Sequence, residues 1–378
     1  MPNSDHAKGA GVSASSGGSV TLTGVALVGN SEEGAFSDGA GSTVTLSASI
    51  ARDGVMLTGN TAGNGAVAQN GGKLVLTDSA LIGNHESGLL MFDPLTSAEV
   101  THSIIARQLP STGKQFGRGV VLQNGPTLTM SQSVVAFNTD IGISARGAGS
   151  TATISESVLR DTGSQLSDGA HGRALNIIEQ AQVTVSKCEL LRNAEVSALV
   201  SGGSAQLSVD SSVIASTNLD TKSKSAGRGF AAQTNGIGVV TGSLIVDNFQ
   251  VGVSAAGVGG QLTLGTSLVD KTKALSDGTF GHGILANDNS TLVLSSSTSR
   301  GSAGVGLIVG GSTATVSHCR ILDNAVGINV QDGSLLSQVD TVPTEPTALD
   351  VDVSNDTVFD GNQTRIGSDE LPIPTPLN

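Results

Sequence analysis

A recurring phrase of alternating residues constrains the fold of this chain more than any other feature. An aliphatic–Thr–aliphatic–Ser/Thr stretch is followed by one small residue, an aliphatic pair and often Asn. The small residue returns at alternating intervals of about 24 and 30 residues, so the repeating unit is a pair of coils of about 54 residues. Its positions are Val25, Ser49, Ser79, Ser103, Ser133, Ser157, Cys188, Ser212, Ser243, Ser267, Ser297 and Cys319.

A coil of this length has room for three short strands separated by corners of Gly, Ser and Asn, which predicts a three-sided parallel β-helix. An aliphatic column stands three positions before the small residue, as at Leu22, Leu46 and Leu76, and is expected to face inward. Narrow aliphatic layers and tight corners explain why the chain has 51 Gly but only 8 Phe and no Trp or Tyr. We predict about 12–13 coils with alternating 24- and 30-residue turns.

Several phrases resemble known repeat proteins. They include the segments Gly147–Val158, Leu275–Ile284 and Gly310–Cys319. The pattern resembles the right-handed parallel β-helix repeat proteins, the pectin-lyase-like superfamily in its broad sense, and the tandem β-helix repeats of secreted myxobacterial proteins. The resemblance covers about residues 17–333 and implies an all-β, right-handed parallel β-helix solenoid. Because this fold carries lyases, hydrolases, adhesins and inert rods, it does not by itself select a chemistry.

The chain divides into three expected segments. Residues 1–16 form a polar N-terminal lead-in, 17–333 the β-helix, and 334–378 an acidic degenerate final coil with a Pro-rich tail. The final coil is expected to cap an open β-edge. A net charge of −13 disfavours nucleic acid as a partner, and no apolar run is long enough for membrane insertion. We expect an extracellular or cell-surface monomer with no signal peptide in this chain.

Two short motifs look like parts of a polygalacturonase active site. They are Asn138-Thr139-Asp140 and Gly281-His282-Gly283. The family's paired Asp-Asp and Arg-Ile-Lys are missing, and the two motifs lie about six coils apart. At about 4.8 Å per coil they would be roughly 25–30 Å apart, whereas paired catalytic carboxyl groups lie within about 10 Å. We therefore assign no catalytic residue and expect no polygalacturonase-type catalysis.

A line of basic residues is the candidate binding site. The long coils carry their extra residues just before a Gly-polar-Gly triplet, whose central residues are Asn64, Arg118, Arg173, Arg228 and His282. The last four predict a basic track suited to an acidic polysaccharide or surface polymer. The alternative is local, with each Arg pairing with an acid such as Asp161 or Asp168 and fixing its own loop.

An asparagine column is interpreted as structural. Asn tolerates the left-handed backbone of a corner, and its amide can bond to the same amide one or two coils away. The predicted ladder is Asn30, Asn84, Asn138, Asn193, Asn248 and Asn324.

Other candidates are weaker. The outward Thr-x-Thr positions resemble the ice-binding faces of β-solenoid antifreeze proteins, but Glu99 and Asp210 interrupt them. Cys188 and Cys319 are expected to be too far apart to form a disulfide and to replace Ser in its column. We expect no metal site and no cofactor, although four acids of the final coil could supply oxygen ligands for Ca²⁺: Asp350, Asp352, Asp356 and Asp360.

The sequence thus favours a non-enzymatic secreted or cell-surface rod that presents a repetitive face to a polymer or partner. The alternative is a polysaccharide lyase or hydrolase with its site on the long-coil loop face, and ice binding is a minor alternative. Carboxylates or an Arg–Asp pair converging in a groove on adjacent coils would favour the enzyme. Isolated salt bridges matched to the coils would favour the rod.

Overall fold

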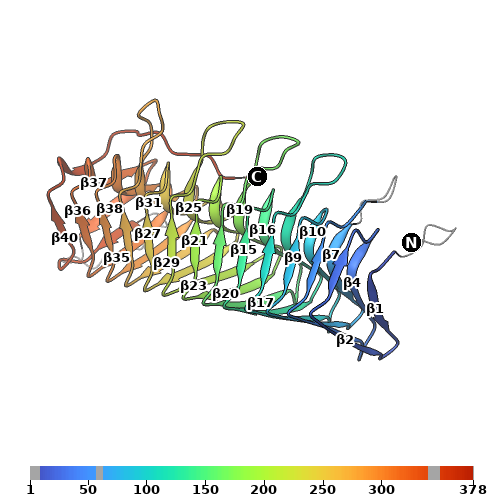
Figure 1. Ribbon diagram of the computed structural model, residues 1–378. Coiled ribbons are helices and arrows are strands. Elements are labelled where there is room, and N and C mark those ends of the chain that lie inside the picture. The colour runs from blue at the N-terminus through green and yellow to red at the C-terminus, as the bar shows by residue number, and fades with distance from the viewer. Residues whose placement is uncertain (1–8, 57–62, 339–349, 378) are drawn as a thin grey trace. The chain divides into compact units, whose positions relative to one another are not determined.

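The computed structural model describes residues 9–56, 63–338 and 350–377, and the regular secondary structure of these residues is entirely β-strand. The chain separates into two compact units. Unit 1 comprises Met1–Ala194 and Thr221–Ser223, and unit 2 comprises Glu195–Asp220 and Lys224–Asn378. Within each unit every third strand pairs in parallel with the next, which builds three sheets that we call A, B and C (Figure 1). This all-β, three-sheet arrangement confirms the predicted fold class.

In unit 1, sheet A consists of β1 (Val12–Ser15), β4 (Glu33–Asp38), β7 (Asn64–Gln69), β10 (Ser87–Phe92), β13 (Arg118–Gln123), β16 (Ile141–Arg146) and β19 (Arg173–Ile178). Sheet B consists of β2 (Ser19–Thr23), β5 (Thr43–Ser47), β8 (Lys73–Thr77), β11 (Ser97–Thr101), β14 (Thr127–Ser131), β17 (Thr151–Ser155) and β20 (Gln182–Ser186). Sheet C consists of β3 (Ala26–Val28), β6 (Ile50–Arg52), β9 (Ala80–Ile82), β12 (Ile104–Ala106), β15 (Val134–Ala136), β18 (Val158–Arg160) and β21 (Glu189–Leu191).

In unit 2, sheet A consists of β22 (Val196–Ser201), β25 (Arg228–Gln233), β28 (Val251–Ala256), β31 (His282–Asn287), β34 (Val305–Gly310), β37 (Val326–Gln331) and β41 (Thr364–Gly367). Sheet B consists of β23 (Gln206–Asp210), β26 (Ile237–Thr241), β29 (Gln261–Gly265), β32 (Thr291–Ser295), β35 (Thr313–Ser317), β39 (Asp350–Val353) and β38 (Leu335–Gln338). Sheet C consists of β24 (Val213–Ala215), β27 (Leu244–Val246), β30 (Leu268–Asp270), β33 (Thr298–Arg300), β36 (Arg320–Leu322) and β40 (Val358–Asp360).

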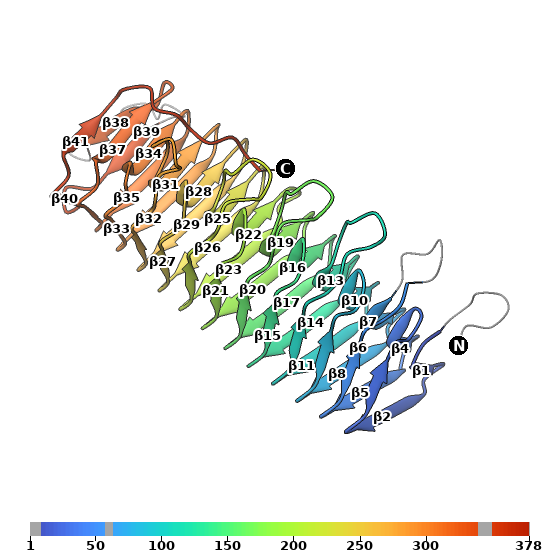
Figure 2. The ribbon, with the colours of Figure 1, turned by 45° about the horizontal axis from the view of Figure 1, so that its top comes forward.

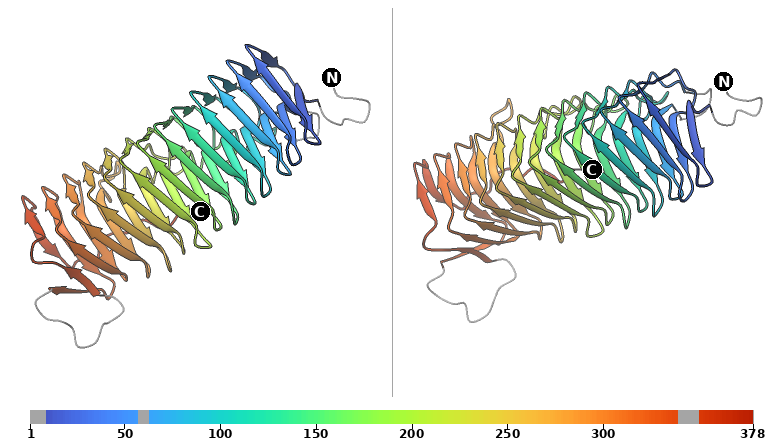
Figure 3. Two further views of the ribbon diagram at one scale, coloured as in Figure 1. Left: turned by 90° about the horizontal axis from the view of Figure 1, so that it is seen from below. Right: turned by 60° about the horizontal axis from the view of Figure 1, so that its bottom comes forward.

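The strands pair at the same intervals as the sequence repeat. In sheet B of unit 1, Ser19 lies opposite Thr43, Thr43 opposite Lys73, and Lys73 opposite Ser97, which are steps of 24, 30 and 24 residues. Strands of one sheet therefore follow one another side by side within a unit (Figure 3). The predicted inward column is buried from the second coil onward, with Leu46 and Leu76 fully inaccessible to solvent, whereas Leu22 of the first coil is half-buried. The extra residues of the long coils form loops between sheets C and A, such as 107–117 and 271–281, which project from their units (Figure 2).

Serine side chains close the corner between sheets B and C. Ser79 Oγ accepts a hydrogen bond from Ser49 N–H at 3.1 Å, and Ser103 Oγ accepts one from Ser79 N–H at 3.1 Å. Cys188 continues this column, since its buried sulfur accepts from Ser157 N–H at 3.4 Å. These bonds pair backbone groups that a corner would otherwise leave without partners.

Asparagine side chains close the corner between sheets C and A through hydrogen bonds, while the backbone of the Asn itself is not left-handed. Asn138 Oδ1 accepts from Gln108 N–H at 3.2 Å, while Nδ2 donates to Ile105 O at 3.4 Å. The expectation that Asn itself is left-handed is wrong, because the residue with positive φ is the one before it, as at Phe137 with φ 56°. Side-chain bonds to the backbone of neighbouring coils also form at Asn84, Asn193, Asn248 and Asn324. Asn324 bonds in addition to the amide of Asn362, and Asn30 Nδ2 has no partner in the described part of the chain.

A glycine stands second in most strands of sheet A, and the reason is steric. A Cβ on Gly119 would lie 2.5 Å from the carbonyl oxygen of Gly142 and 2.7 Å from Val135 Cγ1. Such contacts are closer than a carbon atom can tolerate. Glycine thereby lets successive coils approach at this corner.

The last coil begins after the segment 339–349, which lies outside the described residues. Strands β39, β40 and β41 pair in parallel with β35, β36 and β37, so residues 350–367 of the segment expected as a degenerate coil supply one strand to each sheet of unit 2. β38 pairs with the far side of β39 and ends sheet B. At the other end of the chain, β1 includes Val12–Ser15 of the segment expected as a lead-in and pairs with β4.

Candidate functional site

Three strands of sheet A repeat one set of side chains along the outer face of their sheet. The first residue of the strand is Arg or His, the fourth is aliphatic and the sixth is an amide. The sets are Arg118, Val121 and Gln123 in β13; Arg228, Ala231 and Gln233 in β25; and His282, Leu285 and Asn287 in β31. β13 belongs to unit 1 and the other two strands to unit 2, so the same set can be compared in two settings.

In unit 2 the C-terminal segment 371–377 lies extended over this face. Leu371 N–H donates to Gln331 Oε1 and Gln331 Nε2 donates to Leu371 O, each at 3.0 Å. At the other end of the segment, Leu377 N–H donates to Gln233 Oε1 at 3.0 Å, and Gln233 Nε2 donates back to Leu377 O. Figure 1 shows this segment running back from β41 to the level of β25. Each glutamine side chain therefore forms hydrogen bonds with both the N–H and the C=O of one residue of the segment.

Arg228 and His282 hold the carbonyl groups between these two clamps. Arg228 Nη2 donates to Thr375 O at 2.5 Å, and Arg228 Nε donates to Gln250 Oε1 at 2.7 Å. His282 Nε2 lies 3.2 Å from Pro372 O, while Val305 N–H donates to His282 Nδ1 at 3.3 Å. Burial lowers the pKa of His282 to about 4, so the ring is neutral and carries its proton on Nε2.

Apolar contacts complete the binding of the segment. Leu371 and Ile373 pack against Leu285 and Ile308 of sheet A. Leu377 packs against a second cluster, formed by Val196, Leu199 and Ala231. The fourth residues Ala231 and Leu285 thus face outward and are covered by the segment, and each is at most 1% exposed.

The matching face in unit 1 contains an open pocket of ≈ 230 Å³. It lies between β10, β13 and the end of the loop 107–117, and its lining residues are Glu86, Ser87, Leu90, Phe92, Phe116, Arg118, Val121 and Gln123. We call this pocket the unit 1 groove. It contains all three members of the β13 set. Within the described residues, neither the amide of Gln123 nor the terminal nitrogens of Arg118 form a hydrogen bond.

Arg118 is fixed by the next coil. Its Nε donates to Asp140 Oδ2 at 2.6 Å, and its guanidinium carbon lies 4.9 Å from the centre of the Phe116 ring. Asp140 is fully buried and its second oxygen lies 2.7 Å from His171 Nδ1. Burial alone would raise the pKa of Asp140, but the bonds from His171 and Arg118 outweigh it and lower that pKa. Asp140 is therefore an ionised anchor whose two oxygens are both occupied.

Glu86 is the unusual group of the groove. Its Oε1 is buried and has no hydrogen-bond partner in the described part of the chain. Burial raises the pKa of Glu86 to about 7, against the opposing effect of the Arg118 charge. A carboxyl group with this pKa carries a proton for part of the time at neutral pH and can then donate a hydrogen bond.

The predicted basic track is thus divided between the two units. Arg118 pairs with Asp140 rather than with Asp161 or Asp168, and Arg173 Nη1 donates to Asn176 Oδ1 at 2.8 Å. Arg228 and His282 lie beneath the C-terminal segment. Sequence reasoning missed the interleaved column that precedes the sheet A strands of the short coils: Glu32, Glu86, Asp140, Glu195 and Gln250. Their spacing of 54 or 55 residues, the same as that of the basic column, was the available signal.

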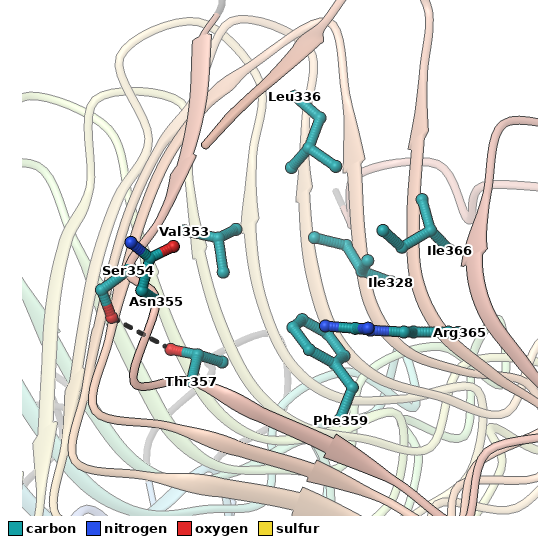
Figure 4. Close-up of a pocket in the computed structure, with 9 residues that line it drawn as sticks. All are labelled: Ile328, Leu336, Val353, Ser354, Asn355, Thr357, Phe359, Arg365 and Ile366. Atoms are coloured by element: carbon teal, nitrogen blue, oxygen red, sulfur yellow. Dashed lines mark hydrogen bonds between the residues drawn. The ribbon is translucent and has the colours of Figure 1, made fainter. Parts of the chain in front are cut away.

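Two further pockets lie elsewhere in the two units. One of ≈ 70 Å³ lies in the last coil of unit 2, where Arg365 lies over Phe359 at 5.4 Å beside Ile328 and Val353 (Figure 4). Its lining is mixed, since four of the nine residues are aliphatic and four are polar or charged. The other, of ≈ 320 Å³, lies on the outer face of sheet C in unit 1, where Arg107 and Arg160 lie over Phe137.

The remaining candidates show no assembled chemistry. Among the described residues, no group of three or more His, Cys, Asp or Glu side chains could hold a metal ion, and Asp356 binds His318 at 2.9 Å. Calcium binding therefore stays a prediction, as does the ice-binding ladder, which a Lys73–Glu99 ion pair interrupts on sheet B. Cys188 and Cys319 are buried free thiols. In the part of the chain covered by the structure, no helix could span a membrane.

Three parallel sheets, corners closed by side-chain ladders and coils of two alternating lengths define a parallel β-helix repeat protein. A family model described as "Right handed beta helix region" matches residues 3–159 and 111–269. The chain therefore belongs to the right-handed β-helix family, as its repeat predicted. No curated protein and no solved structure matches it.

Proposed function

We propose that this β-helix protein is a non-enzymatic, secreted or cell-surface scaffold that binds one extended polymer chain in the unit 1 groove. The observation that carries the proposal is the bound C-terminal segment of unit 2. It lies on side chains at the same strand positions as those that line the open groove of unit 1. The two faces share a cation, an aliphatic residue and an amide, so a surface of this composition is suited to an extended chain.

Binding is tested with the full-length protein and three labelled polymers, namely polygalacturonate, a neutral glucan and gelatin. We expect at least one polymer to bind without becoming shorter. Leu90→Arg places a long charged side chain in the groove and should weaken binding at least tenfold, by about 1.4 kcal/mol. Thr129→Arg, on the exposed face of β14, is the matched control and should leave binding unchanged. Binding to none of the polymers, or equal binding by both variants, would overturn the proposal.

An enzymatic function is the second candidate, and Glu86 is the observation that favours it. Its raised pKa of about 7 and its position beside Arg118 are typical of a general acid. A glycoside hydrolase commonly needs a second available carboxylate, however, and both oxygens of Asp140 are taken by Arg118 and His171. If polymer chains become shorter with the native protein but not with Glu86→Gln, the function is enzymatic.

A further inference from the structure

The C-terminal segment shows in detail what the outer face of sheet A recognises. Its sequence from Leu371 to Leu377 is Leu-Pro-Ile-Pro-Thr-Pro-Leu, with proline at every second position between the two leucines. Alternate prolines favour the extended polyproline conformation, which is already ordered before binding and loses little entropy on docking. The protein holds this segment through its backbone, by two bidentate glutamines and two single bonds from Arg228 and His282.

The length of the segment matches the spacing of the coils. Leu371 lies at β37 and Leu377 at β25, which is four strands further along sheet A. Four steps of about 4.8 Å make roughly 19 Å, and six residues at about 3.2 Å each also make roughly 19 Å. Three peptide residues therefore correspond to two coils. Pro374, halfway between the leucines, is buried, so residues three apart in the segment lie against the sheet, and Ile373 adds a further apolar contact.

The unit 1 groove repeats the recognition elements at this spacing. β13 and β25 read Arg-Gly-apolar-apolar-apolar-Gln, and their Arg residues are anchored alike. Arg228 Nε binds Gln250 of the following coil, which leaves Nη2 for a peptide carbonyl, and Arg118 Nε binds Asp140 of the following coil. A second glutamine, Gln69, ends β7 two strands before β13, the interval that three extended peptide residues span. Gln69 lies outside the pocket lining, and its Nε2 donates to Asp38 Oδ1 at 3.2 Å.

We infer that the polymer bound in the unit 1 groove is a polypeptide, an extended proline-containing segment whose apolar residues recur at every third position. This rests on the proposed function and names its ligand. Gln123 pairs with the N–H and C=O of one peptide residue, as Gln233 does with Leu377. Arg118 donates to a peptide carbonyl, as Arg228 does to Thr375. Val121 and Leu90 contact the apolar side chains, as Leu285 and Ile308 contact the tail.

The probe for this inference is a fluorescent peptide with the sequence of residues 368–378, added to the full-length protein and followed by anisotropy. We expect saturable binding to one site. Gln123→Ala should weaken it about thirtyfold, because two hydrogen bonds, together about 2 kcal/mol, are lost. Gln233→Ala removes the same side chain from the occupied face of unit 2 and is the matched control, which should not weaken binding. A peptide with Asp in place of both leucines should not bind.

Each outcome decides between the two proposals. If Gln233→Ala but not Gln123→Ala weakens binding, the peptide only exchanges with the resident tail, and the inference is wrong. If the peptide does not bind while a polysaccharide binds in a Leu90-dependent way, the inference fails and the proposed function stands. If nothing binds, both fail. Self-association that requires both Gln123 and residues 371–378 would support the inference, with a second copy of this chain as the source of the peptide.

Discussion

The asparagine ladder leads to a quantitative prediction for Asn138→Ala. Asn138 is 2% exposed and bonds to Gln108 N–H and Ile105 O, groups from two positions of the neighbouring coil. Alanine leaves both backbone groups buried without partners. At about 1.2 kcal/mol for each lost bond, the free energy of unfolding should fall by about 2.5 kcal/mol.

The melting temperature follows from the size of the unit that unfolds. With about 2.1 cal/mol/K per residue, the loss corresponds to about 3 °C if the whole chain unfolds together and about 6 °C if unit 1 unfolds alone. Calorimetry measures this shift, and hydrogen exchange at the Gln108 amide should become faster. Thr129→Ala, an exposed substitution in the same coil, is the control and should change stability by less than about 0.5 kcal/mol. An Asn138→Ala protein that melts within 1 °C of the native one would refute the structural interpretation of the ladder.

Three further outcomes are expected. Gly119→Ala should lower the melting temperature by more than Asn138→Ala does, because the new Cβ would lie 2.5 Å from Gly142 O. Gly163→Ala is the control, since a Cβ there meets no atom within 4 Å. A similar decrease in both glycine variants would contradict the steric explanation. The lowered pKa of His282 means that stability is complete above pH 6.5 and decreases as the pH falls toward 4; His282→Gln should remove this decrease in pH-dependent melting. The raised pKa of Glu86 has the opposite effect, because the native protein loses stability as the pH rises from 4.5 through 7. The melting temperature of Glu86→Gln should therefore increase relative to that of the native protein over this range. A difference in melting temperature that is equal at pH 4 and pH 8 would exclude the titration of Glu86 as its cause.

The sequence was sufficient for the features that recur in every coil. The inward column, the column of small residues and the two coil lengths are local patterns that the sequence shows directly. The left-handed residue was placed one position too late because Asn is a good candidate for that conformation. The structure instead gives it to residues such as Phe137 and Arg192, whose side chains carry no such signal.

The contact between the C-terminal segment and sheet A could not be predicted from sequence patterns, for a different reason. Gln331 and Leu371 are 40 residues apart, and Gln233 and Leu377 are 144 residues apart. Nothing in the local sequence of the Pro-rich tail indicates which sheet it covers. The basic column was found, but its role was assigned from charge alone. The pairing of Arg118 with Asp140 depends on which side chains the fold stacks in adjacent coils.

The alternation of acids and bases along the edge of sheet A limits how such a chain can grow or shrink in evolution. β16 lies between β13 and β19, and its coil places Asp140 between Arg118 and Arg173. Loss of that one coil would bring the two guanidinium groups onto neighbouring strands, about 4.8 Å apart, with no carboxylate between them. Loss or duplication of a complete pair keeps the alternation of the two columns. Lineages of this protein should therefore differ in length by multiples of about 54 residues rather than by single turns.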